Sequence, residues 1–294
     1  MSLGELVAQL YSEKPSGALY HYASLDGLMK IVQGRKIRAT DGRYFSDSAE
    51  MRHAAELIHT AINHELTLSR LPNDKVSMRF FEQFLQWVNQ EMDHGYGPYV
   101  ACFTAQGNLL SQWRGYTPPV RGVSLGFDPA TLCAAAESQK PAFMMGKCIY
   151  DRNKKLDVVV EVISQVFELA KAEGEKGTTI WSFYHVFDEI KLDLMRVMAL
   201  LKDDPFREEE EWRAVCAKDI HTAPAIEYRE GTSSLIPFIN FKLSPDRGAG
   251  LIRVVVGPTP HVTQSVNAVK AFLSQSDALP DHSISYCDIP YRTW

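Results

Sequence analysis

The chain has 294 residues, of which 45% are hydrophobic and 11% aromatic, enough to build a large buried core. Its formal net charge of −5 argues against a broad basic surface for nucleic acid, although it leaves room for a local basic groove. The N-terminus is amphipathic and acidic rather than a signal peptide, and no apolar run approaches the roughly 18 residues of a membrane span. Five scattered cysteines without CxxC spacing predict reduced, packed thiols, so we expect a soluble, cytoplasmic protein that does not bind membranes.

Helix and strand patterns alternate over the first 45 residues. An amphipathic helix is expected at 3–13 and a short strand at 19–22, after which Ser24 caps a second helix. A strand at 36–40 then leads into a loop at 41–45.

Two long helices are predicted between about 48 and 94. The first starts at a capping box formed by Asp47 and Glu50, and the second spans 75–92. The second carries an apolar stripe that we expect in the core, made of Val76, Phe80, Phe81, Phe84, Leu85 and Val88.

The remaining elements complete an α+β pattern. A helix starts at Asp128 and Pro129, and two long helices are expected at 155–173 and 180–201. Strands are expected at 99–103, 123–127, 143–150, 210–218, 224–229, 235–243 and 251–256, followed by a helix at 261–274 and a strand at 283–289. Residues 1–294 are therefore predicted to form one α+β domain with a central mixed or antiparallel sheet and helical insertions at about 48–94 and 151–202.

Four consecutive glutamates, 208–211, run into the strand predicted at 210–218. Because strand side chains alternate between faces, one face should pack in the core through Trp212, Ala214 and Cys216. The other face then carries Glu209, Glu211 and Arg213. Two carboxylates this close need a nearby cation, a shifted pKa or full solvation. The simplest interpretation is an exposed, charged start of a strand, and the functional one is a pair of catalytic carboxylates.

The densest polar and aromatic stretch lies around Gly107 and Gly115, glycines that would let the backbone approach a ligand. A guanidinium suits phosphate or carboxylate, and aromatic rings can stack on a flat ring. The candidate binding residues are Ser111, Gln112, Trp113, Arg114 and Tyr116. The alternative is a buried tryptophan beside a surface arginine.

Two further pairs are candidates for ligand contacts. His21 and Tyr22 alternate faces of a strand, and Arg43 and Tyr44 lie in a loop that follows one. A structural histidine and a surface arginine are the ordinary alternatives. No Walker loop, GxGxxG, HExxH, GxSxG or paired CxxC occurs, and the histidines lack metal-ligand spacing, so no metal is expected.

Several of these motifs occur together in a recognisable order. They are Tyr20-His-Tyr-Ala-Ser24, Arg43-Tyr-Phe-Ser-Asp47 with Glu50, Leu110-Ser-Gln-Trp-Arg-Gly-Tyr116, Phe206 with Glu209-x-Glu211-Trp-Arg213, and Val256-Gly-Pro258. From about residue 19 to 258 the chain resembles the bacterial domain-of-unknown-function family twenty-nine seventy-one. It departs from that family's pattern at Ser46, where asparagine is usual, and at Ser48, where proline is usual.

The layout is also similar to the ADP-ribosyltransferase superfamily, especially its nucleic-acid-modifying and phage-defence branches. Those proteins share an opening strand with His or Arg, an aromatic that stacks nicotinamide, and a late strand with Glu-x-Glu. The resemblance implies a split sheet, NAD as substrate and no metal. It assigns Glu211 to stabilising the cationic ribose and Glu209 to the acceptor, or the two in exchanged roles.

The same resemblance assigns the binding residues. It implies that His21 holds the adenosine-side ribose, that Tyr22 or Tyr44 stacks the nicotinamide, and that Arg43 or Arg114 meets the pyrophosphate. Arg213 would temper the repulsion between the two carboxylates. The expected function is an NAD-using ADP-ribosyltransferase or NAD glycohydrolase, as in a toxin or phage-defence effector, with protein, DNA, RNA or water as acceptor.

Two other functions fit the same residues. The first is a non-catalytic module that senses a nucleotide or phage component through a surface formed by Trp113 and Arg114. It would tolerate loss of the acids, whereas catalysis would not. The second is a metal-independent phosphodiesterase or hydrolase that uses His21 and the carboxylates as acid and base.

Overall fold

The computed structural model describes residues 2–45, 50–67, 75–94, 97–119, 121–175, 182–218, 226–245, 247–280 and 283–289. Its strands are β1 (Leu19–Ser24), β2 (Lys36–Asp41), β3 (Tyr99–Thr104), β4 (Gly122–Phe127), β5 (Met144–Lys147), β6 (Glu211–Cys216), β7 (Glu227–Glu230), β8 (Leu235–Lys242), β9 (Leu251–Val256) and β10 (Ser283–Tyr286). The α-helices are α1 (Leu3–Leu10), α2 (Leu25–Gly34), α3 (Glu50–Thr67), α4 (Lys75–His94), α5 (Leu110–Tyr116), α6 (Pro129–Ser138), α7 (Arg152–Glu175), α8 (Tyr184–Met198) and α9 (Val262–Gln275). Short 3-10 helices are η1 (Gly42–Tyr44), η2 (Asp204–Glu209) and η4 (Arg247–Gly250).

The predicted α+β class is confirmed, and the sheet is open and mixed. The strands form one sheet in the order β10-β9-β4-β1-β3-β2-β8-β7, and β6 pairs with β3 and with β5. Among the described strands, β9 and β10 run parallel and the other pairs are antiparallel.

The sheet divides at β3. Strand β6 pairs with β3 along its whole length, from Tyr99 to Thr104. The other edge of β3 is shared, because it pairs with β1 only at Thr104 and with β2 only at Tyr99 and Val100. β1 and β2 therefore diverge from one strand and lead into two groups of strands.

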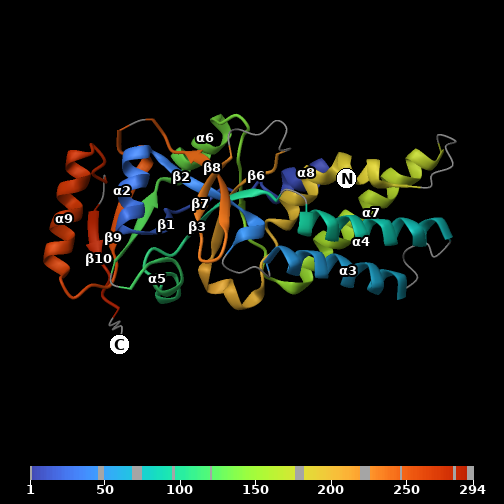
Figure 1. The fold of residues 1–294 in the computed structure, drawn as a ribbon, viewed down its shortest axis with the longest axis horizontal. Helices are drawn as coiled ribbons and strands as arrows, with labels where there is room; N and C mark the ends of the chain where they lie inside the picture. Colours follow the sequence, from blue (N-terminus) through green and yellow to red (C-terminus); the bar gives the residue numbers. More distant parts are fainter. Residues whose placement is uncertain are drawn as a thin grey trace.

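Helices cover both faces of this sheet (Figure 1). One face packs against α2, α6 and α9 through Leu28, Leu132 and Leu273, which share a core with Trp212 and Cys216. On the other face, α5 covers β1, and a helical bundle made of α3, α4, α7 and α8 lies at one end of the molecule (Figure 1).

The two predicted helical insertions pack together in that bundle, because α3 contacts α7 and α4 contacts α8. Most of the predicted stripe on α4 is confirmed in the core, with Phe80, Phe81, Phe84 and Val88 buried and Leu85 partly buried. Val76 is the exception and is 62% exposed. It lies in the first turn of α4, one turn before the aromatic cluster begins.

Several boundaries differ from the predictions. Residues 110–116 form a helix for which the sequence analysis made no prediction, and the strand predicted at 143–150 spans only Met144–Lys147. The helix predicted from 180 begins at Tyr184, and the last strand ends at Tyr286 rather than 289. Asp128 caps α6 as predicted, since its Oδ2 accepts from the Thr131 N–H at 2.8 Å. The predicted cap residue Asp47 and the family departures Ser46 and Ser48 lie outside the described residues.

Candidate functional site

A tight turn places the first of the two glutamates. Glu209 ends η2, whose first turn is capped by Asp203, and Glu210 then adopts a left-handed backbone conformation with φ of 41°. Strand β6 therefore begins at Glu211, one residue later than predicted. The Thr104 hydroxyl donates to the Glu209 carbonyl oxygen, which ties the turn to the end of β3.

The alternation predicted for β6 is confirmed. Trp212, Ala214 and Cys216 lie in the core beneath α2 and α6. Glu211 and Arg213 point to the opposite face, where Glu209 joins them through the 3-10 turn. The simple interpretation of an exposed strand start is wrong, because Glu209, Glu211 and Arg213 are all buried. The helical bundle covers this face as well.

A cation that the sequence analysis missed connects the two acids. The ammonium of Lys202, which is 1% exposed, donates to Oε2 of Glu209 and to Oε2 of Glu211. Arg213 donates to Glu211 from Nε at 2.9 Å and from Nη2 at 3.0 Å. Two carboxylates and two cations thus form a buried network of zero formal net charge. We call these four residues the carboxylate cluster.

Backbone contacts fix the carboxylate cluster in place. Arg213 Nη1 donates to the Ala199 carbonyl oxygen at 2.8 Å, and Lys155 Nζ donates to the Lys202 carbonyl oxygen at 2.9 Å. The Glu211 N–H donates to the Tyr150 hydroxyl at 2.9 Å. Lys202 directly follows the apolar run 197–201, and this lysine at the end of a buried segment was the available sequence signal.

The cations keep Glu211 ionised. Burial by itself would raise the pKa of this carboxyl group, but the charges of Arg213 and Lys202 outweigh it and lower the pKa to about 2. Burial raises the pKa of the neighbouring Cys102 thiol well above its ordinary value, and the charge of Glu211 adds to the rise. Glu211 is therefore the charged member of this pair at neutral pH.

The exposed end of α5 lies near these charges. Burial, and then the negative charge of Glu209, raises the pKa of the Tyr116 hydroxyl. Even so, 47% of the surface of Tyr116 remains exposed. Arg114 is exposed on the same short helix. Tyr116 is thus partly exposed on α5 and lies close enough to Glu209 for its charge to act on the hydroxyl.

Trp113 is buried, although the sequence analysis offered it as a surface binding residue. It is 2% exposed, and its Nε1 donates to Asn108 Oδ1 at 2.9 Å. Its ring packs edge-on against Tyr22 at 4.6 Å between centroids. A binding surface that includes the Trp113 ring is therefore wrong for this structure, because the ring fills the space between α5 and the sheet.

Tyr22 is also occupied by structural contacts. Its hydroxyl donates to the Gln106 carbonyl oxygen at 2.9 Å and accepts from the Leu109 N–H at 2.9 Å. These bonds hold the loop that leads into α5. On α5, Gln112 is buried and Ser111 Oγ is buried without a hydrogen-bond partner among the described residues.

His21 lies on the opposite face of the sheet from Glu211. The pairing of Tyr20 with Thr104, and of Thr104 with Glu211, puts those three residues on one face and their neighbour His21 on the other. The His21 ring packs near Phe103, and its Nδ1 lies 2.9 Å from the Cys102 carbonyl oxygen, where β1 and β2 diverge. The structure therefore separates His21 from the two carboxylates.

Arg43 and Tyr44 lie on η1, which leads to the carboxylate cluster through Phe45. Arg43 donates to Asp41 from Nε at 3.0 Å and from Nη2 at 2.7 Å, while Tyr44 is 39% exposed. The ring of the next residue, Phe45, packs against the Arg213 guanidinium, with 5.3 Å between the ring centroid and Arg213 Cζ. The Arg43 guanidinium is thus paired with Asp41, whereas the Tyr44 ring is accessible to a ligand.

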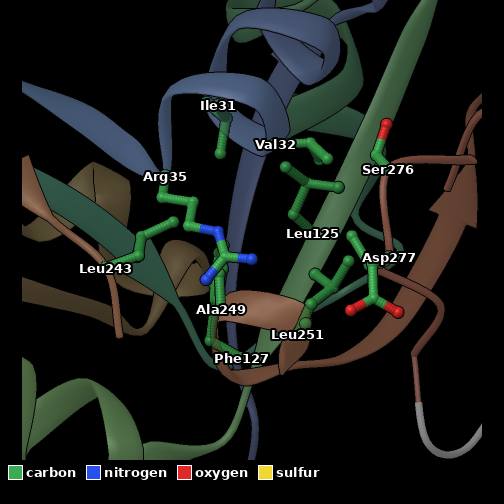
Figure 2. Close-up of a pocket in the computed structure, with 12 residues that line it drawn as sticks. Ile31, Val32, Arg35, Leu125, Phe127, Leu243, Ala249, Leu251, Ser276 and Asp277 are labelled. Carbon is green, nitrogen blue, oxygen red and sulfur yellow. The ribbon is translucent and has the colours of Figure 1, made fainter. Parts of the chain in front are cut away.

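A small cavity lies on the other side of the sheet, away from the carboxylate cluster. Figure 2 shows Ile31, Val32 and Leu125 around it, together with Arg35 and Asp277. Its volume of about 10 Å³ holds roughly one water molecule, which is too little for a nucleotide.

Comparison with known proteins gives a family match over part of this region. Residues 112–214 match the family model described as Protein of unknown function (DUF2971). The match starts within α5 and ends within β6, so it contains Lys202, Glu209, Glu211 and Arg213. No curated protein and no solved structure gives a significant match.

Neither a metal centre nor a membrane-spanning helix occurs among the described residues. No three His, Cys, Asp or Glu side chains among them converge as a metal ion would require. No helix in the described part of the chain has the length and apolar character needed to cross a membrane.

Proposed function

We propose that this protein cleaves the nicotinamide–ribose bond of NAD, as an ADP-ribosyltransferase or an NAD glycohydrolase. The observation that carries the proposal is the ionised Glu211, held by Arg213 and Lys202 at the start of β6 and close to the partly exposed Tyr116. Cleavage of that bond develops positive charge on the ribose. A fixed carboxylate stabilises such charge by an amount worth roughly 3–4 kcal/mol, about two to three decades in rate.

The geometry refines the roles. Glu211 would face the ribose, and Glu209, across the shared Lys202, would orient the acceptor. Tyr116 or Tyr44 would stack the nicotinamide, since Tyr22 is engaged under α5. Arg114 would meet the pyrophosphate. His21 takes no part at this site, because it lies on the other face of the sheet.

Lys202 would have a second role. Its ammonium is shared between both carboxylates, and Arg213 supplies the second positive charge. The developing cation on the ribose would compete with Lys202 for Glu211, so that the carboxylate gains a partner as the bond breaks. In this proposal, the division of the sheet at β3 would correspond to the split sheet of the ADP-ribosyltransferases. An enzyme of this kind would suit a toxin or phage-defence effector, with protein, nucleic acid or water as acceptor.

The test is nicotinamide release from NAD by the purified protein, with cell lysate added as a source of acceptors. Glu211→Gln should lower release by about 100-fold or more, and Glu209→Gln should lower transfer to an acceptor more than hydrolysis. Glu208→Gln is the matched control, because Glu208 belongs to the same acidic run and is exposed. Full release by a folded Glu211→Gln protein would remove Glu211 from the mechanism.

A sensor remains a second candidate, favoured by the fact that Glu209 and Glu211 are already engaged by cations while Arg114 and Tyr116 are exposed. A sensor would lose nucleotide binding on Arg114→Ala or Tyr116→Ala and would tolerate Glu211→Gln. Absence of nicotinamide release together with this binding pattern would favour the sensor.

A further inference from the structure

A second cleft opens at the end of the sheet where β1 and β9 begin. It has a volume of about 450 Å³, within the range of small-molecule sites. Residues 13–20 form one side, and the other contributions come from Ala105, Lys147, Glu210, Trp212, Ile252 and Arg253. Neither Glu209 nor Glu211 lines it.

Arg253 and Tyr20 meet in this cleft because a glycine lies between them. Gly126 pairs with Tyr20 on one side and with Arg253 on the other, so the three residues share one face of three neighbouring strands. A Cβ on Gly126 would come within 2.7 Å of the Tyr20 ring. Without that atom, Arg253 Nη1 lies 3.4 Å from the Tyr20 hydroxyl oxygen.

The guanidinium of Arg253 has no carboxylate within ion-pairing distance among the described residues. The other two cations of the cleft are neutralised, Lys14 by Glu137 at 2.9 Å and Lys147 by Glu13 at 3.4 Å. Arg253 is therefore the positive charge available to a ligand.

Two of the residues that line the cleft, Ser16 and Gly17, also carry backbone donors. The N–H groups of Ser16 and Gly17 make no hydrogen bond within the described part of the chain. The position of a Cβ on Gly17 has no neighbouring atom within 4 Å. An arginine together with free backbone N–H groups is the donor set that binds phosphate oxygens.

We propose that this cleft binds the phosphate group of a small phosphate ester. Arg253 donates to the phosphate oxygens, Tyr20 orients the guanidinium, and the backbone at Ser16 and Gly17 supplies further donors. A volume of about 450 Å³ leaves room for an organic part of nucleoside size beside the phosphate. The inference does not rest on NAD cleavage, because the cleft and the carboxylate cluster share no side chain.

The test is titration of the full chain with AMP, inorganic phosphate and adenosine, each followed by calorimetry. AMP should bind, adenosine should not, and inorganic phosphate should compete with AMP. Arg253→Gln should weaken AMP binding by about tenfold to a hundredfold, because it removes charge-assisted hydrogen bonds. Tyr20→Phe, which keeps the ring, should weaken it less.

Arg52→Gln is the matched control, since Arg52 is exposed on α3 and does not line the cleft. Phosphate binding as tight as AMP binding would identify free phosphate as the ligand. Equal affinity for AMP and adenosine, equal weakening by Arg52→Gln, or no binding of AMP or phosphate at millimolar concentration would overturn the proposal. Nicotinamide release is measured separately on Arg253→Gln, where we expect it unchanged.

Discussion

Arg213 and Glu211, two residues apart on β6, face each other fork to fork, with Nε and Nη2 donating to the carboxylate at 2.9 and 3.0 Å. Both side chains are buried, so their mutual contact replaces the water that each would otherwise bind. Lys202 extends this pair to Glu209 and makes the carboxylate cluster a single unit.

Removing the shared ammonium should destabilise the fold. In Lys202→Met, Glu209 loses this cation and Glu211 keeps its contact with Arg213, so we expect a loss of about 3–5 kcal/mol in the free energy of unfolding. Urea denaturation measures it. Lys14→Met is the control, because Lys14 and Glu137 form an exposed ion pair, and it should cost less than about 1 kcal/mol. Equal losses in the two variants would contradict the buried network.

Glu211 should make stability depend on pH in the acid range. Its pKa is about 2 in the folded protein and near 4.5 when unperturbed, so the unfolded chain takes up the proton first as pH falls. The stabilisation, roughly 3 kcal/mol, is complete above pH 4.5 and is lost between about pH 4.5 and 2. Unfolding free energies measured across this window should fall less steeply for Glu211→Gln than for the wild type. Glu208→Gln should retain the wild-type slope.

His21 should add a second pH dependence, nearer neutrality. Burial lowers its pKa below 6.5, so below that pH the unfolded chain binds a proton that the folded protein does not. Stability should therefore decrease as pH falls from 6.5 towards 5, by up to about 1.4 kcal/mol per pH unit. His21→Gln should flatten the curve, since its amide can still donate to Cys102. Replacement of the exposed His261 by glutamine should leave the curve as it is.

Truncation of Trp113 should lower stability, whereas truncation of Tyr116 should weaken NAD binding. Trp113→Ala empties the space between α5 and β1 and should cost about 3–5 kcal/mol of stability, measured by thermal or urea unfolding. Tyr116→Ala should leave stability within about 1 kcal/mol and raise KM for NAD severalfold. Tyr228→Ala, at a 62% exposed position on β7, should change neither quantity. A large loss of stability in Tyr116→Ala would show that its role is packing.

Features that depend on local periodicity could be predicted from the amino-acid sequence. Alternation along 211–216 predicted which side chains face the core, and the Asp128–Pro129 pair predicted a helix start, since both follow from backbone geometry over a few residues. The aromatic stripe of α4 predicted a buried face for the same reason.

The surroundings of those side chains depend on the tertiary fold. The helical bundle covers the charged face of β6, and Lys202 reaches Glu209 and Glu211 from the chain that follows α8, so a strand start that looked solvated is a buried network. The register of β1 with β3 puts His21 on the other face from Glu211, and α5 turns Trp113 inward while Tyr116 stays exposed. These relationships depend on strand pairing and helix packing between residues far apart in the chain, which periodicity within one segment does not specify.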